Sequence, residues 1–270
     1  MTTATAPARR TTAAAPHRLT FLRSLRGEWI KLATLRSTWW SIAVTALITI
    51  GIALLIAQTV NAPEFGAIRA AVSPIQFTML LAGVLGVIVV TGEYSTGMIR
   101  STLTADPVRG SVLAAKALTT AVFLFVASFL IFLAAALAVS PIMAGRDQSI
   151  DWSEPTASII PLLAASLSMA VFALIGVAFG FILRSGAGAI AATVGVLFVL
   201  PIVASLFATP DPAWSWIADL SRHLPMSAAQ SAILPGTSGG LDEPVAYLTL
   251  AGWVAAGMLS AWAVLRTRDA

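Results

Sequence analysis

The segment 92-GEYSTGMIRSTLTADPVRGSVLAAK-116 is a polar interruption between two very apolar runs, and it carries charges of both signs. Within it, Met98, Ile99 and Leu103 recur at helical spacing, which predicts a short helix with an apolar stripe. A passive linker needs neither the paired charges nor the stripe. The stripe has two interpretations, which are a docking face for a partner and a contact with the lipid surface.

A second, longer helix is predicted to follow. Asp106 and Pro107 match an N-cap and a first helical residue, and no strong breaker follows before Pro141. A helix over residues 107–139 would be roughly 50 Å long at about 1.5 Å per residue, whereas a bilayer core is about 30 Å thick. We therefore expect about two to four turns of this helix to stand outside the membrane, where a soluble partner could dock.

The composition predicts an all-α integral membrane protein. Of the 270 residues, 58% are hydrophobic and 10% are charged, whereas a soluble domain carries about 25% charged residues. Six apolar runs, each near the length needed to cross a bilayer, lack Asp, Glu, Lys, Arg and His. They predict six transmembrane helices over residues 39–58, 72–91, 118–139, 159–183, 187–208 and 245–265.

The region before the first predicted span divides into two parts. Residues 1–18 are rich in Ala, Thr and Pro and predict a disordered cytosolic tail. After them, Leu22, Leu25, Trp29 and Leu32 recur at helical spacing while basic residues share another face. This pattern favours an amphipathic helix in the membrane interface; the alternative is a positively charged flank without a helix.

Lys and Arg are distributed unevenly over the predicted loops. With the N-terminus in the cytosol, the cytosolic segments hold 13 of these residues and the outer segments hold 3, namely Arg69, Arg146 and Arg222. The positive-inside rule then predicts a multi-pass protein of the cell membrane with both termini and the segment 92–116 in the cytosol. Because membrane topology explains the basic residues, we expect the bilayer, and no nucleic acid, as a partner.

No motif in the sequence supports catalysis. The sequence has no G-x-x-x-x-G-K-[ST] motif and no cysteine, and its two histidines fall on opposite sides of the membrane. Residues 236–240 match G-x-S-x-G around Ser238, but their setting favours a glycine-rich turn over a nucleophile. We therefore expect no enzyme activity, no metal and no cofactor bound by this chain.

Two further features leave alternatives open. The outer loop 209–244 is too apolar for a solvated loop, and predicts either one or two short helices entering the outer interface or a loop packed over the helix ends. Small residues in the spans would allow close helix approach, within the chain or across a dimer seam. These are Gly83, Gly86, Gly176, Gly180, Gly188 and Gly195.

Taken together, four features resemble the permease subunits of ABC-2-type transporters. They are the entry segment Glu28-Trp29-Ile30-Lys31 with 35-LRSTWW-40, the stretch 91-TGEYSTGMIR-100 with Pro107, Arg109 and Lys116, the stretch 223-HLPMSA-228, and the six-span plan over residues 19–268. The second of these is the most specific. The substrate varies across the family, so the resemblance does not indicate one.

The resemblance implies a six-helix permease domain over residues 19–268, working as a homodimer or heterodimer in an exporter. ATP and Mg would be held by separate cytosolic ATPase subunits, which dock on a coupling helix between the second and third spans. The residues implied in this coupling are Glu93, Tyr94, Gly97, Met98, Ile99, Arg100, Leu103, Pro107 and Arg109.

Within the coupling segment, Ile99 is expected at the centre of the ATPase contact, and Glu93 with Arg109 is expected to brace the ends of the loop. Two other functions are compatible with the same sequence. One is a non-transporting membrane scaffold that holds a cytosolic partner. The other is a secondary carrier, which the uncharged spans disfavour because such carriers use ionisable groups inside the bilayer.

Overall fold

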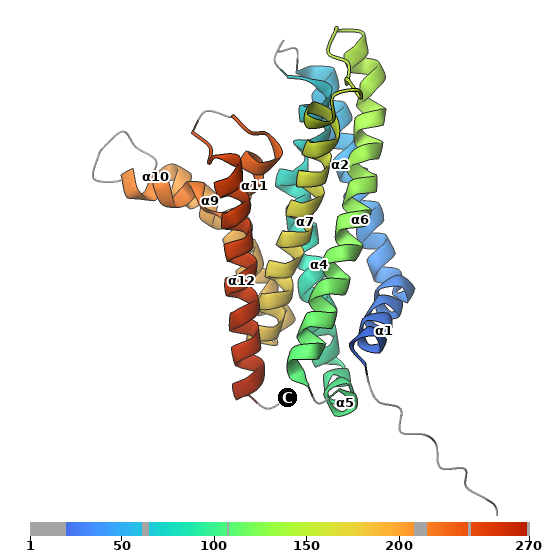
Figure 1. Cartoon of the computed structure of the whole chain (residues 1–270), viewed down its shortest axis with the longest axis vertical. Coiled ribbons are helices and arrows are strands. Elements are labelled where there is room, and N and C mark those ends of the chain that lie inside the picture. Colours follow the sequence, from blue (N-terminus) through green and yellow to red (C-terminus); the bar gives the residue numbers. More distant parts are fainter. Residues whose placement is uncertain (1–19, 61–64, 107, 208–214, 237–238, 269–270) are drawn as a thin grey trace, which may run out of the picture.

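The computed structural model describes residues 20–60, 65–106, 108–207, 215–236 and 239–268, and every regular element in these ranges is a helix (Figure 1). Six helical stretches are long and apolar enough to cross a membrane, which confirms the predicted all-α class and number of spans. The predicted disordered tail, Pro107, and Thr237 and Ser238 of the G-x-S-x-G match lie outside the described residues.

The spans are formed by six stretches of helix, and shorter helices lie between and before them. In chain order the helices are α1 (Phe21–Thr34), α2 (Arg36–Thr59), α3 (Ala67–Val72), α4 (Ile75–Ser95), α5 (Met98–Ala105), α6 (Arg109–Ala144), α7 (Pro155–Leu183), α8 (Gly186–Val194), the π-helix η1 (Gly195–Val199), α9 (Leu200–Leu206), α10 (Ser215–Arg222), α11 (Pro225–Ile233) and α12 (Glu243–Thr267). The outer loop thus contains two short helices, α10 and α11.

The third span, α6, begins later and ends later than the sequence suggests. Val108 is its N-cap residue, so the prediction of Asp106 as the N-cap is wrong, and the predicted first helical residue, Pro107, lies outside the described residues. The carboxylate of Asp106 instead accepts a hydrogen bond from the backbone N–H of Val108, at 3.1 Å, in a turn that precedes the helix. Pro141 lies inside the last two turns, which shows that proline did not end this helix.

Two spans are interrupted in ways that hydropathy does not reveal. Ser73 and Pro74 separate α3 from α4, although both helices belong to one apolar stretch. The fifth span widens into a π-helix at Gly195–Val199. Helix α9 then begins at Leu200, with Pro201 in its first turn. Proline frees a backbone carbonyl one turn earlier, and a π-turn is one local adjustment by which a helix in a membrane accommodates it.

The centre of the bundle is α7, of which 78% of the most apolar window is buried inside the protein. It packs on α4 at a seam where glycines let the backbones meet. A methyl group on Gly86 would lie 2.0 Å from the carbonyl oxygen of Ala173, and one on Gly176 would lie 2.0 Å from that of Gly83. These glycines therefore serve packing within the chain, whereas Gly195 has no neighbouring atom within 4 Å.

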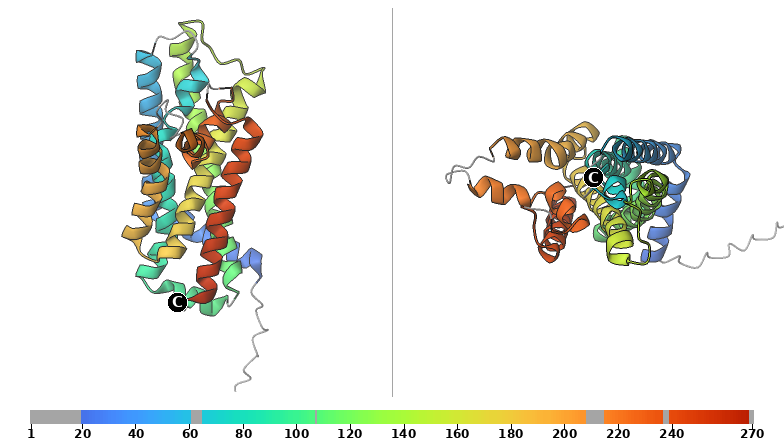
Figure 2. Two further views of the ribbon diagram at one scale, coloured as in Figure 1. Left: turned by 90° about the vertical axis from the view of Figure 1, so that its left-hand side faces the viewer. Right: turned by 90° about the horizontal axis from the view of Figure 1, so that it is seen from above.

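The two ends of the bundle differ in what they carry. Helices α1 and α5 and the C-terminal end of α12 lie together at one end, whereas the loop between α6 and α7 lies at the other (Figures 1 and 2). The turn between α7 and α8 is tight, with Arg184 in the left-handed region at φ 54° and Ser185 capping α8. Helices α10 and α11 follow the fifth span, with α11 packed against α12 and α7.

Candidate functional site

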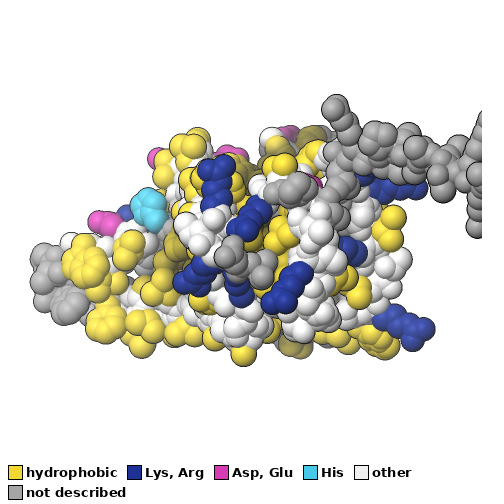
Figure 3. Space-filling model, turned by 90° about the horizontal axis from the view of Figure 1, so that it is seen from below, with side chains coloured by type: hydrophobic (Ala, Val, Ile, Leu, Met, Phe, Trp, Pro, Cys, Tyr) yellow, Lys and Arg dark blue, Asp and Glu magenta, His cyan; other side chains and the backbone are white. Residues whose placement is uncertain are grey.

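The end that carries α1 and α5, called the basic end below, gathers most of the cationic side chains. Figure 3 views the molecule from this end and shows Lys and Arg spread over it. The described Lys and Arg residues here are Arg23, Arg26, Lys31, Arg36, Arg100, Arg109, Lys116, Arg184, Arg266 and Arg268. The opposite end has Arg69, Arg146 and Arg222.

A left-handed glycine sets the direction of α5. Gly97 has φ 72°, a conformation that costs glycine little, and it connects the end of α4 to the first residue of α5. The preceding turn is closed by the backbone N–H of Gly97, which donates to the carbonyl of Tyr94 at 3.3 Å, and by the hydroxyl of Thr96, which donates to the carbonyl of Gly92 at 2.9 Å. As a result α5 crosses the basic end instead of extending α4 (Figure 2).

The apolar stripe of α5 is turned toward the protein itself. Ile99 is 3% exposed and Leu103 is partly buried, whereas Met98 is 42% exposed. In this structure Ile99 is therefore covered by its own chain and is not presented to a partner. The reason is that residues four apart share a helix face, and this apolar face can be buried in the chain's own bundle without recruiting a partner. The outward side chains of α5 are Met98, Arg100, Ser101 and Thr104.

Next to α5, on the side of the bundle, lies an ion cluster formed by Glu28, Lys31, Glu93 and Lys116. Lys116 Nζ lies 2.6 Å from Glu28 Oε2 and 2.9 Å from Glu93 Oε1. Lys31 Nζ lies 2.8 Å from Glu28 Oε1 and 2.7 Å from Glu93 Oε1. The cluster thus joins α1 to the end of α4 and the beginning of α6, and its formal charges sum to zero.

Burial strengthens the interactions between the charges of this cluster, because little water screens them. The Lys116 side chain is 1% exposed, and Glu28 and Glu93 are also buried. Burial disfavours the charged form of Glu28, but the charges and hydrogen bonds of Lys116 and Lys31 outweigh it and hold its pKa below the ordinary value. Burial likewise opposes the charge of Lys31, yet the hydrogen bonds that it donates to the carboxylates of Glu28 and Glu93 raise its pKa. Oε2 of Glu93 has no hydrogen-bond partner among the described residues.

Helix α1 turns Glu28 and Lys31 toward the bundle, whereas Arg23, Arg26 and much of its apolar surface are exposed. Glu28 and Leu32 are buried, whereas Leu22 is 74% exposed and Trp29 is 44% exposed. The ring of Trp29 meets Phe123 of α6 edge-on, at a centroid distance of 5.8 Å. Leu25 is partly buried. The predicted helix is present, and its four leucine and tryptophan positions are divided between the protein interior and the outer surface.

Arg109 and Tyr94, which flank α5 in the sequence, contact other parts of the bundle. Arg109 does not pair with Glu93; its guanidinium donates to the backbone carbonyls of Leu265 and Arg268, the latter at 3.1 Å, at the end of α12. Arg184 stacks over the ring of Tyr94 at 5.4 Å. Glu93 and Arg109 thus make two separate contacts, one within the ion cluster and one to α12.

Sequence reasoning placed Glu93 at this site but did not bring the other members of the ion cluster to it. The available signal was that the chain has only two lysines, Lys31 and Lys116, that both flank apolar runs, and that Lys31 follows Glu28 by three positions. Sequence separation hides the pairing, because Lys116 lies 88 positions from Glu28. No known protein-family model matches the chain, and no curated protein matches it at a significant level.

Proposed function

We propose that this chain is the membrane-spanning permease subunit of an ATP-driven exporter of the ABC-2 type. It would form the substrate pathway as a dimer, with a second copy or a paralogue, in the cell membrane. The positive-inside rule supports a cytosolic location for the basic end and for both termini. ATP and Mg would be bound by a separate cytosolic ATPase.

One observation carries this proposal, which is the position and bracing of α5. Helix α5 crosses the basic end between the second and third spans, and it offers Met98 and Arg100 to the surrounding solution. The ion cluster and the Arg109 contact connect the flanks of α5 to α1, α4, α6 and α12. A force applied to α5 by a partner would therefore reach four other helices through hydrogen-bonded charges.

The burial of Ile99 changes how this partner would bind. A groove on the ATPase would receive the outward face of α5, with Met98 as its apolar contact and Arg100 beside it. Arginine and methionine are both enriched in protein–protein interfaces, and an exposed arginine favours an acidic patch on the partner. The apolar stripe then supports α5 from behind.

The test is co-expression with an ATPase encoded in an adjacent reading frame. The expected result is a complex of two permease and two ATPase subunits by native mass, with ATP hydrolysis by the complex and none by the purified permease. ATP turnover by a contaminant-free preparation of this chain alone would contradict the proposal. So would the absence of any complex when both proteins are present and the permease is correctly inserted.

A further inference from the structure

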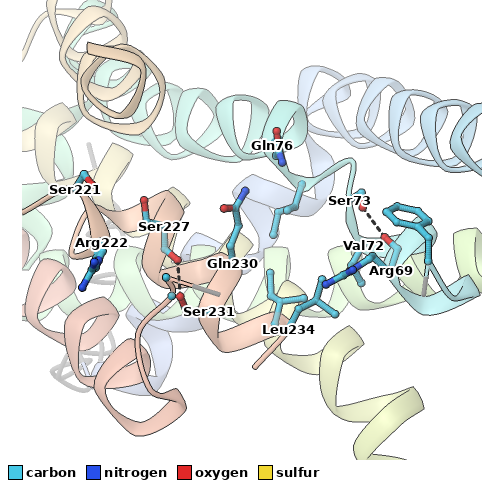
Figure 4. A pocket seen from close by; sticks show the side chains of 15 residues that line it. Arg69, Val72, Ser73, Gln76, Ser221, Arg222, Ser227, Gln230, Ser231 and Leu234 are labelled. Carbon is cyan, nitrogen blue, oxygen red and sulfur yellow. Dashed lines mark hydrogen bonds between the residues drawn. The ribbon is translucent and has the colours of Figure 1, made fainter. Parts of the chain in front are cut away.

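The opposite end of the bundle contains a polar cavity of about 490 Å³. It lies where α3, the first turn of α4, the end of α10, α11 and the loop at Gly239–Gly240 meet (Figure 4). Ligand pockets in proteins commonly enclose about 300–1,000 Å³, so this cavity has room for a small organic molecule. It is separate from α5 and the ion cluster, and the proposed function does not use it.

The charged groups that line the cavity are both cationic. Arg69 enters from α3 and Arg222 from the end of α10, and no carboxylate is among the described lining residues. The guanidinium of Arg69 lies 5.8 Å from the ring of Phe65, and among the described residues it has no carboxylate partner. Arg222 is 3.4 Å from Asp219, but both side chains of that pair are largely exposed. A half-buried arginine without a counter-ion favours an anionic ligand.

Between the two arginines the wall offers neutral hydrogen-bonding groups. Gln230 extends from α11 toward the middle of the cavity, with Gln76 of α4 across from it and Ser227 beside it (Figure 4). Carboxamide and hydroxyl groups both donate and accept, which suits the hydroxyl groups of a ligand. The combination therefore matches a molecule that carries an anionic group together with hydroxyl groups.

Hydrogen bonds of Ser231 and Ser73 fix this wall without using the side chains of Arg69, Gln76 or Gln230. The hydroxyl of Ser231 accepts from the backbone N–H of Leu241 at 3.0 Å and donates to the carbonyl of Ser227 at 3.1 Å. These bonds hold the chain after Gly239–Gly240 against α11. On the other side, the hydroxyl of Ser73 donates to the carbonyl of Arg69 at 2.6 Å, at the break between α3 and α4.

We infer that this cavity binds a hydroxylated organic anion, in which a phosphate or carboxylate contacts Arg69 and hydroxyl groups contact Gln230 and Gln76. Such a group occurs in free solutes and in the headgroups of hydroxylated anionic lipids. In both cases the chemistry is the same and Arg69 is the principal contact. The experiment distinguishes a free solute from a lipid headgroup as the ligand.

The experiment uses the full chain purified in a neutral detergent and two probes, with inorganic phosphate as a comparison ligand that lacks the glycerol hydroxyl groups. Calorimetric titration with sn-glycerol 3-phosphate tests the free solute. Native mass spectrometry of protein from nanodiscs of phosphatidylglycerol and phosphatidylcholine tests the headgroup, by the lipid that stays bound. Either probe binding to the wild type supports the inference, and which one binds identifies the source.

Three variants make the test specific. Arg69→Gln should weaken binding of the active probe at least about ten-fold, because a hydrogen bond to a charged group is lost. Gln230→Ala should weaken binding of glycerol 3-phosphate more than that of inorganic phosphate, because it removes a partner for hydroxyl groups only. Arg36→Gln, an exposed arginine at the basic end, is the matched control and should bind as the wild type does.

Unchanged elution volume and unfolding midpoint would establish that Arg69→Gln is folded, and Arg69→Lys, which keeps the charge, should bind with intermediate affinity. The inference is overturned if neither probe binds the wild type. It is equally overturned if a probe binds wild type and folded Arg69→Gln alike.

Discussion

Replacing Lys116 by methionine removes the most buried cation of the ion cluster at nearly constant side-chain volume. Lys116 contacts Glu28 at 2.6 Å and Glu93 at 2.9 Å, and its side chain is 1% exposed. Breaking a buried pair by deleting one partner costs about 3–5 kcal/mol, because the remaining charge stays buried. Lys31 still neutralises one carboxylate, so we expect Lys116→Met to lower the free energy of unfolding by about 3 kcal/mol. This raises the unfolding equilibrium constant more than about 100-fold.

The pH dependence gives this prediction a sign. In the wild type the pKa of Glu28 is lowered, so its ionisation stabilises the fold above its ordinary pKa, and this stabilisation is lost as pH falls through the folded-state pKa. In Lys116→Met, burial without a counter-charge should raise the pKa of one carboxylate. The defect of the variant should therefore be large at pH 8 and smaller near pH 5, where that carboxylate takes up a proton.

The assay is unfolding of the purified protein in mixed micelles by titration with SDS, at both pH values. Lys31→Met is the matched control, since Lys31 is 33% exposed and its loss should cost about 1 kcal/mol or less. The double variant Glu28→Gln/Lys116→Met restores a net charge of zero to the ion cluster and should be more stable than Lys116→Met alone. The reasoning is refuted if Lys116→Met unfolds with the wild type at pH 8, or if the double variant shows no recovery.

Three further predictions address packing, topology and the proposed partner. Gly176→Ala places a methyl group 2.0 Å from a backbone carbonyl of α4 and should destabilise the protein by about 3 kcal/mol or more in the same unfolding assay, whereas Gly51→Ala, with no atom within 4 Å, should be neutral or stabilising. In this cysteine-free chain, a cysteine at Ser95 should be shielded from an impermeant thiol reagent in intact cells and one at Ser149 should be labelled; the reverse pattern would invert the topology. Met98→Asp should reduce co-purification of the ATPase without changing insertion or the unfolding midpoint, because Met98 is exposed in the isolated chain; undiminished co-purification would place the partner contact elsewhere.

The number, order and class of the spans follow from the sequence because membrane insertion depends on local hydropathy, which each segment carries by itself. The helix ends were less predictable. Helix α6 begins at Arg109 and continues past Pro141 to Ala144, and hydropathy marks neither of these ends. The π-helix at Gly195–Val199 leaves no periodic signal in five residues.

The candidate site was predictable in location but not in orientation. The apolar stripe correctly indicated a helix between the second and third spans, but periodicity identifies only that a face is apolar and leaves open what covers it. Ile99 illustrates this, since it is buried by its own chain. The ion cluster depends on tertiary contacts between residues as far apart as Glu28 and Lys116, which pattern analysis along the chain does not bring together.

The uneven burial of the spans has a consequence for how the sequence can change. In α7, 78% of the most apolar window is enclosed by other helices, whereas in α12 the corresponding share is 17%. A side chain of α7 meets neighbours of fixed shape, so the exchange of one aliphatic residue for another leaves a void or a clash. A side chain on the outer face of α12 meets fluid acyl chains, which adapt to either shape. Random mutagenesis should therefore leave aliphatic exchanges scattered along α12 and few in α7, and a library selected for the stably folded protein would reveal this contrast.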